Sequence, residues 1–166
     1  MIMLMKIRII TTGGTFEKVY DPLSGSLIFT DSFIPKIVTE LNIDVSIIHE
    51  KLFSIDSTNM NEEHRRKILK SCQLSEEKKI LIIHGTDTMT LSAKLIGKHE
   101  LKKTILFTGS MTPFSINNSE ASFNLGYALA KLDFLKKGVF IAMNGRLFDY
   151  KNVKKNKDKG VFEKLY

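Results

Sequence analysis

Residues 79–84 read KILIIH, and residues 103–108 read KTILFT. Each segment is a nearly continuous apolar run, which is typical of a strand in a parallel sheet whose two faces are both covered by helices. Around these two segments, β-branched runs alternate with helical patterns. The sequence therefore predicts an α/β fold, with an open, doubly wound and mainly parallel sheet of about five strands and helices on both faces.

The expected elements follow this alternation along the chain. Strands are expected at residues 6–11, 44–53, 79–84, 103–108 and 139–144, helices at 32–41, 60–74, 88–98 and 120–137, and a short extended pair at 18–20 and 26–29. Asn59 with Glu62 resembles a capping box at the start of the second helix. Lys136, Lys137 and Gly138 predict the end of the fourth helix, with cations in the last turn and a glycine stop.

The composition describes one domain with a basic tail. The chain has 166 residues and is 43% hydrophobic, which suits a single domain spanning residues 1–166. The net charge is +7, and +4 of it lies in residues 150–166. A solvated, lysine-rich terminus is the favoured interpretation of this tail. A nucleic-acid partner ranks last, because aromatic residues, apart from Phe162 and Tyr166, are not interleaved with the lysines.

The single cysteine, Cys72, cannot form an internal disulfide, and its spacing puts it on the apolar side of a predicted helix. A reduced, cytoplasmic setting is therefore expected. The amino-terminal MIMLMKIRII has its cations behind the apolar stretch, the wrong order for a signal peptide, and no run is long enough to cross a membrane. No metal is expected, because His49, His64 and His99 lie on separate elements without ligand spacing.

Hydroxyl groups, glycines and one acid follow the predicted strands at the edge where parallel strands end. Residues 12–15 read TGGT, and residues 84–89 read HGTDTM. The chain has no P-loop, no three-glycine dinucleotide fingerprint and no G-x-S-x-G elbow. Taken alone, the paired glycines indicate a turn, Asp87 a helix cap and His84 a packed residue. Because they converge on one edge, they together indicate a ligand site.

Five segments of the chain, taken in order, carry a family resemblance. They are TTGGT (11–15), DSTNM (56–60), IIHGTDTM (82–89), LFTGSM (106–111) and AMNGRLFDYKNVKK (142–155). They resemble the successive motifs of the bacterial asparaginase/glutaminase family. The match covers essentially the whole chain but only the amino-terminal domain of the usual two-domain enzyme, as in a short, single-domain branch. The resemblance implies an amidohydrolase that converts L-asparagine to L-aspartate and ammonia through a threonine nucleophile and an acyl-enzyme, with L-glutamine as a further candidate substrate.

The resemblance also implies roles for individual residues, without a metal or an organic cofactor. The implied catalytic residues are Thr12 as the nucleophile, Tyr20 from a flexible loop, Thr86 with its acid Asp87, and Lys155. The implied substrate-binding residues are Gly13, Ser57, Thr58, Thr86, Asp87 and Ser110. Thr15 would support the turn. Lys154 is an open alternative to Lys155, because the two are neighbours in the lysine-rich tail.

The family's second domain, which completes the active site from a neighbouring subunit, has no counterpart in the matched motifs. A homo-oligomer, either a dimer or a tetramer, is therefore expected, because an open site would be wet and would lose electrostatic strength. Closure by Glu17 is another possibility at this stage. The alternative function is a weakly active or inactive binding module for asparagine, aspartate or a related amide.

Overall fold

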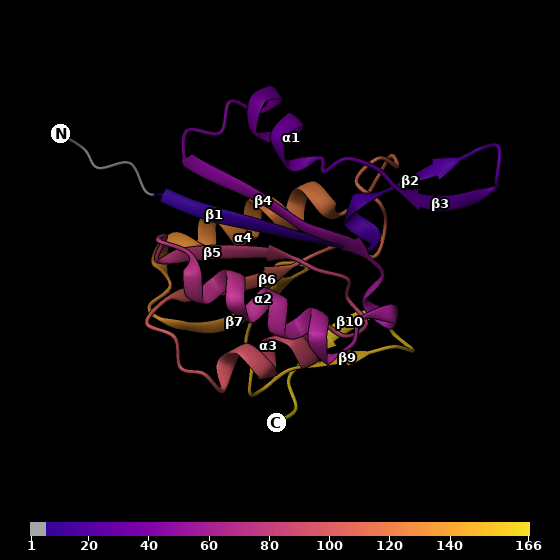
Figure 1. Ribbon diagram of the computed structural model, residues 1–166. Helices are drawn as coiled ribbons and strands as arrows, with labels where there is room; N and C mark the ends of the chain where they lie inside the picture. The colour runs from indigo at the N-terminus through magenta and orange to yellow at the C-terminus, as the bar shows by residue number, and fades with distance from the viewer. Residues whose placement is uncertain (1–5) are drawn as a thin grey trace.

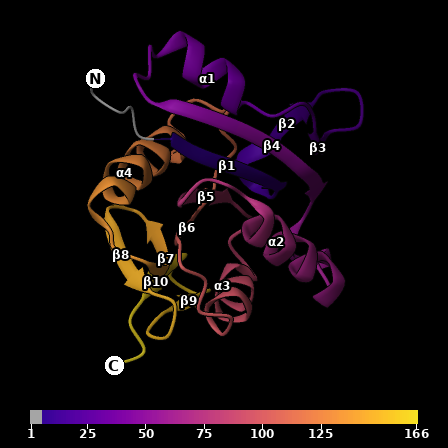
Figure 2. The same ribbon diagram turned by 60° about the vertical axis from the view of Figure 1, so that its left-hand side comes forward.

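The computed structural model describes residues 6–166 as a six-stranded sheet between two layers of helices (Figures 1 and 2). The strands lie in the order β4-β1-β5-β6-β7-β8, and only β8 runs antiparallel to its neighbour. The sheet contains β1 (Lys6–Gly13), β4 (Ser46–Ile55), β5 (Lys79–Ile83), β6 (Thr104–Thr108), β7 (Gly138–Met143) and β8 (Arg146–Asp149). The helices are α1 (Ile34–Glu40), α2 (Glu62–Leu74), α3 (Met89–Gly97) and α4 (Ala121–Phe134). The predicted doubly wound α/β fold is confirmed.

Each face of the sheet packs against its own pair of helices. One core contains Ile9, Leu81 and Leu106 of the sheet with Ile37 of α1 and Leu125 of α4. The other contains Ile10, Ile82 and Phe107 with Leu69 of α2 and Ile96 of α3. Successive residues of a strand point to opposite faces, so a strand covered on both sides must be apolar at every position. This is the physical reason for the continuous apolar runs.

The sixth strand, β8, was not predicted. It pairs antiparallel with β7, and Met143 lies opposite Arg146. The two residues between them, Asn144 and Gly145, have φ values of 50° and 75°. Two-residue hairpin turns favour this left-handed pair of conformations, and Asn-Gly is their strongest sequence signal. The signal was therefore present in the sequence at 144–145.

Two predicted helix termini were wrong. The capping box of α2 is formed by Asn61 and His64, while Asn59 belongs to a preceding 3₁₀ turn, η2 (Ser57–Asn59). Helix α4 ends at Phe134, three residues earlier than expected. Gly138, taken as the helix stop, instead opens β7 with a φ of 147°. At the start of α2 the chain forms an extra 3₁₀ turn, and after α4 it leaves the helix before the lysines at 136 and 137.

Two small hairpins stand outside the main sheet. The first consists of β2 (Lys18–Asp21) and β3 (Ser26–Phe29), follows the 3₁₀ turn η1 (Thr15–Glu17), and confirms the predicted extended pair. The second consists of β9 (Lys154–Asn156) and β10 (Val161–Glu163) and was not predicted. Figure 1 shows the β2–β3 hairpin extending away from the body of the molecule. The lysine-rich tail is thus a folded hairpin.

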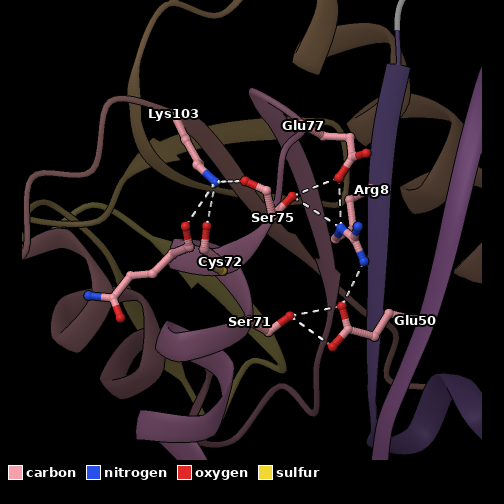
Figure 3. A network of polar contacts seen from close by, with 8 residues as sticks. Arg8, Glu50, Ser71, Cys72, Ser75, Glu77 and Lys103 are labelled. Atoms are coloured by element: carbon pink, nitrogen blue, oxygen red, sulfur yellow. Dashed lines mark hydrogen bonds and ion pairs between the residues drawn. The ribbon is translucent and has the colours of Figure 1, made fainter.

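A polar network fixes the end of α2 to the sheet (Figure 3). Arg8 on β1 donates to Glu77 at 2.8 Å, to Ser75 at 3.1 Å and to Glu50 at 3.0 Å. The Glu77 side chain is only 5% exposed, so its charge depends on this partner. Lys103 donates to carbonyl groups at the end of α2, which would otherwise lack partners. This network holds the carboxyl end of α2, the helix that follows β4, against the sheet.

Cys72 is fully buried on α2, as its spacing predicted. Residues 1–5, on which the expectation about a signal peptide partly rests, lie outside the described residues. Among the helices of residues 6–166, none has the length and apolar character needed to cross a bilayer.

Candidate active site

The topology directs attention to the carboxyl end of β1. The chain leaves β1 for β4 on one side and then returns to β5 on the other, so the order of strands reverses at β1. In open α/β sheets, ligands bind at such a switch point, beyond the carboxyl ends of the strands. Strand β1 runs through Gly13, and the turn that follows it meets the segments after β4 and β5.

Glycines bring these segments into direct backbone contact. A Cβ atom added to Gly14 would lie 2.5 Å from the Cα and N atoms of Gly85, and one added to Gly85 would lie 2.6 Å from Cβ of Ser57. Gly13 is similarly close to the backbone of Ile55 and has a φ of 98°. The glycines therefore let the ends of β1, β4 and β5 approach more closely than any side chain would permit. This contact joins the TGGT and HGTD segments.

Thr86, Asp87 and Lys155 form a hydrogen-bonded group at this edge. Lys155 Nζ donates to Thr86 Oγ1 at 2.9 Å and to Asp87 Oδ1 at 2.8 Å. The Thr86 hydroxyl in turn donates to Met111 Sδ at 3.4 Å. The Lys155 side chain is 12% exposed and that of Asp87 36%, so the group is most open at the carboxylate. A hydroxyl, an amine and an orienting carboxylate in this order have the geometry of a proton-transfer site.

The β9–β10 hairpin explains why Lys155 points inward. Lys155 lies opposite Phe162, and Lys154 lies opposite Glu163. Paired residues share one face of a hairpin, and Phe162 is 2% exposed in the core. Lys154 Nζ instead pairs with Glu163 on the other face at 3.2 Å. The single buried phenylalanine therefore decides which of the two lysines reaches Thr86.

The segment after β4 supplies Ser57 beside this group. Ser57 is 1% exposed, its Oγ accepts from the Thr88 backbone N–H at 3.4 Å, and its carbonyl accepts from the Thr88 hydroxyl at 2.8 Å. Thr58 is exposed, and both its N–H and its hydroxyl donate to Asp56. Ser57 thus lies against the HGTD segment, whereas Thr58 is held away by its bonds to the preceding acid.

The two threonines of the TGGT turn differ in accessibility. Thr12 lies within β1 and is fully buried, and its hydroxyl donates to the Ile83 carbonyl at 3.0 Å. This placement does not suit the role of nucleophile that was expected for it. Thr15 is partly exposed and directly follows Gly14, just as Thr86 directly follows Gly85. The extension of the strand through Gly13 was not expected, and it is what buries Thr12.

Two other predicted site residues lie apart from the hydrogen-bonded group. Tyr20 is 59% exposed on β2 of the projecting hairpin, opposite Leu27. Ser110 is 1% exposed, and its hydroxyl donates to the Thr112 carbonyl at 2.6 Å. In the described chain, Ser110 shapes the turn after β6, and Tyr20 makes no hydrogen bond to the group of Thr86, Asp87 and Lys155.

His84 is a packed residue, as its position at a strand end predicted. Its Nδ1 lies 2.7 Å from the Gly85 carbonyl and must donate to it, which leaves Nε2 to accept from the Ser92 hydroxyl at 2.8 Å. Burial lowers the pKa of His84 to about 4, which keeps the imidazole neutral. The ring therefore orients the Gly85 carbonyl beside the site.

Glu17, which was considered as a residue that closes the site, is buried and does not lie at an open edge. It is 2% exposed on η1, and burial raises its pKa to about 7 despite the hydrogen bond from Ser32. An acid within the TFEK segment, two residues after Thr15, was the only signal for it in the sequence. Within residues 6–166, no three His, Cys, Asp or Glu side chains gather into a possible metal site.

The fold and the site define a class of α/β domain in which hydroxyl, lysine and carboxylate groups meet at the topological switch point. The family model described as "Asparaginase, N-terminal" matches residues 6–162. The chain therefore belongs to the asparaginase family of amidohydrolases, and the predicted resemblance is confirmed.

Individual relatives support the same family. A glutamyl-tRNA(Gln) amidotransferase subunit of Thermococcus kodakarensis is 29% identical over 88% of this chain and 35% of its own length. The corresponding protein of Archaeoglobus fulgidus is 32% identical over 74% of this chain and 30% of its own length. The chain spans about a third of these curated relatives.

Solved structures agree on the fold. The thermostable L-asparaginase from Thermococcus kodakarensis has a TM-score of 0.86 at 24% identity, covering 97% of this chain and 51% of that one. The probable cytoplasmic L-asparaginase from Campylobacter jejuni has a TM-score of 0.80 at 26% identity, covering 96% of this chain and 53% of that one. This chain corresponds to about half of each.

Proposed function

We propose that this protein hydrolyses the side-chain amide of L-asparagine, with L-glutamine as a further candidate substrate. The observation that carries the proposal is the hydrogen-bonded group of Thr86, Lys155 and Asp87 beside the TGGT turn. A threonine hydroxyl is a weak nucleophile until a neighbouring base takes its proton. In its neutral form, an amine within hydrogen-bond distance of a hydroxyl can take that proton, and the carboxylate orients the amine.

The proposed reaction has two steps. A threonine Oγ bonds to the amide carbon, the C–N bond breaks, and the nitrogen leaves as ammonia with the proton that the hydroxyl lost. Water then attacks the resulting ester, releasing aspartate and restoring the hydroxyl. In this scheme Lys155 acts through Thr86 to accept and return protons. The Gly14 N–H is already donated to the Ile55 carbonyl at 3.0 Å, so it is not assigned to the oxyanion.

We assign the nucleophile to Thr15 in place of Thr12. The Thr12 hydroxyl is already used by the Ile83 carbonyl and has no exposed surface. Thr15 is partly exposed and joins the turn through Gly14, whose backbone touches Gly85 next to Thr86. The attacking atom and the group that activates it are then carried by two adjoining segments, which shortens the path for the proton.

Substrate binding is assigned to the polar groups around the same contact. The Asp87 carboxylate, the most open member of the group, suits the α-ammonium of an amino acid, and the Ser57 hydroxyl suits its α-carboxylate. Thr58 is exposed beside Ser57 and would face the substrate only at the entrance. These assignments agree with the residues that the motifs imply.

The test is ammonia release from asparagine and glutamine by the native protein and by single variants. Thr86→Val and Thr15→Ala should each lower kcat/KM for asparagine by about a hundredfold or more. Thr39→Ala, on the exposed side of α1, is the matched control and should keep the native rate. A Thr15→Ala variant with native activity, alongside an inactive and folded Thr12→Ala variant, would return the assignment to Thr12.

The curated relatives favour a second candidate function. They are described as a component of glutamyl-tRNA(Gln) amidotransferase, so this chain could supply the amide-hydrolysing part of a larger assembly. That function predicts weak ammonia release from free asparagine by the isolated chain and a strong increase when a partner is added. Full turnover by the isolated chain would favour the first candidate.

Self-association is the other proposed form of assembly, because the group at Asp87 is open to solvent. It predicts a dimer or tetramer mass in light scattering. A monomer with full activity would contradict it.

A further inference from the structure

The base of the β2–β3 hairpin is fastened at several points, while its tip is free. The Lys18 ammonium pairs with Asp56 at 2.6 Å, and the Lys18 carbonyl accepts from the Ser115 hydroxyl at 2.9 Å. Where the chain leaves the hairpin after β3, also at the base, the Thr30 carbonyl accepts from Lys51 at 3.1 Å. Leu23 at the tip is 97% exposed. The hairpin is therefore attached only at its base, and its position depends on the contacts near residues 17–18 and 30–32.

Glu17 lies at the centre of this base. Its backbone N–H donates to the Gly14 carbonyl at 3.2 Å, within the turn that carries Thr15. Its carboxylate accepts from the Ser32 hydroxyl at 3.2 Å, on the segment that leaves the hairpin. One buried side chain therefore connects the turn before the hairpin with the segment after it.

The surroundings of Glu17 offer little compensation for a negative charge. Lys51 of β4 is the cation that acts on it, but Lys51 also pairs with Asp31 at 3.7 Å and with the Thr30 carbonyl. The Lys18 ammonium is held by Asp56 on the η2 side. The loop before α4 packs against this region with neutral side chains, since Phe114 stacks on Phe16. The donors to the Glu17 carboxylate are the Ser32 hydroxyl and the Phe33 backbone N–H, and burial outweighs them. A charged Glu17 in this setting favours local opening toward water.

We propose that Glu17 is a positioning residue that fastens the β2–β3 hairpin to the turn bearing Thr15, and that ionisation of Glu17 loosens this attachment. The neutral side chain holds the hairpin close to the turn, and the charged side chain draws water into the base. Because the hairpin also carries Tyr20, its attachment would set how tightly the site can be covered. This consequence for catalysis rests on the function proposed above, whereas the movement of the hairpin does not.

Hydrogen exchange of residues 18–30, measured without substrate and corrected for the intrinsic chemical rate, tests the proposal. With a pKa of about 7, Glu17 goes from about one tenth ionised near pH 6 to about nine tenths near pH 8. Native protection of the hairpin should therefore fall by about tenfold across this range. Glu17→Gln should abolish the change, and Glu40→Gln, on an exposed position of α1, should leave it intact.

Ser32→Ala provides a second route if Glu17→Gln does not fold. Loss of the hydroxyl donor should lower protection of the hairpin further near pH 8, where the carboxylate is charged, and have little effect near pH 6. Protection that does not change with pH in the native protein would overturn the proposal, as would a pH dependence that survives in Glu17→Gln. Both results are independent of whether asparagine is a substrate.

Discussion

Replacing Lys155 with methionine should separate activity from stability. Methionine keeps most of the apolar stem that packs in the β9–β10 hairpin but removes the amine that bonds Thr86 and Asp87. Loss of a general base typically costs about 10²–10⁴-fold in rate, which corresponds to roughly 3–5 kcal/mol of transition-state stabilisation. We therefore expect kcat/KM for asparagine to fall by at least about a hundredfold.

The cost in folding free energy should be much smaller. The Asp87 side chain is 36% exposed, so it can be hydrated once its partner is lost, and ion pairs of this exposure contribute only about 0–1 kcal/mol. Thr86 keeps Met111 as an acceptor. Unfolding in urea followed by circular dichroism, which suits a chain without tryptophan, should show a loss of about 1 kcal/mol or less.

The matched variant is Lys154→Met, which removes the neighbouring amine that pairs with Glu163 on the outer face of the hairpin. It should retain native activity and native stability within about 0.5 kcal/mol. If Lys154→Met lost activity while Lys155→Met kept it, the inward orientation of Lys155 and the proposed proton transfer would both be refuted. Equal losses in the two variants would indicate a disrupted hairpin, which the urea measurement would detect.

Three further predictions concern other parts of the structure. Arg8→Met should lower the free energy of unfolding by about 3–5 kcal/mol, because the Glu77 carboxylate is left buried without its partner. The double variant with Glu77→Gln should recover much of this loss, and urea titrations measure both. Gly14→Ala should cost about 1–3 kcal/mol for its backbone conformation alone (φ 74°, ψ 179°), which glycine adopts almost exclusively, and the contact with Gly85 should add to this and abolish ammonia release. Glu17 has a pKa raised from 4.5 to about 7, so its contribution to stability is full below pH 4.5 and is lost as the pH rises through 7. Glu17→Gln should therefore flatten the pH dependence of the unfolding free energy by roughly 3 kcal/mol over that range.

The centre of the main sheet could be predicted because strands that helices cover on both faces, such as β5 and β6, must be apolar at every position. The runs at β5 and β6 have no other simple explanation, and α2 and α3 show the spacing of helices that cover a sheet. The missed elements depend on other information. Strand β8 has four residues and only the Asn-Gly turn as a signal, while the β9–β10 hairpin is lysine-rich and relies on the single buried side chain of Phe162. Such short elements form through tertiary contacts that local patterns do not contain.

The site, too, could be predicted only in part, because some of its features depend on tertiary structure. Thr86, Asp87 and Lys155 come together as the motifs implied, because two strand ends and one hairpin converge on them. The accessibility of a hydroxyl cannot be read from a motif, since TTGGT presents two threonines before the glycines and one after them. Only the length of β1, which ends at Gly13, shows that Thr12 is buried and that Thr15 is not.

The paired glycines of the TGGT turn have a different purpose from the phosphate cradle that glycines after a first strand first suggest. Gly14 and Gly85 pack backbone against backbone, and the residues that follow them, Thr15 and Thr86, therefore lie on adjoining segments. The chemical groups proposed for hydrolysis therefore all lie within residues 6–166. What the open side at Asp87 lacks is cover. The β2–β3 hairpin or another chain could cover this side. The hydroxyl, amine and carboxylate groups beneath such a cover are already assembled, so removing the cover should raise KM more than it lowers kcat.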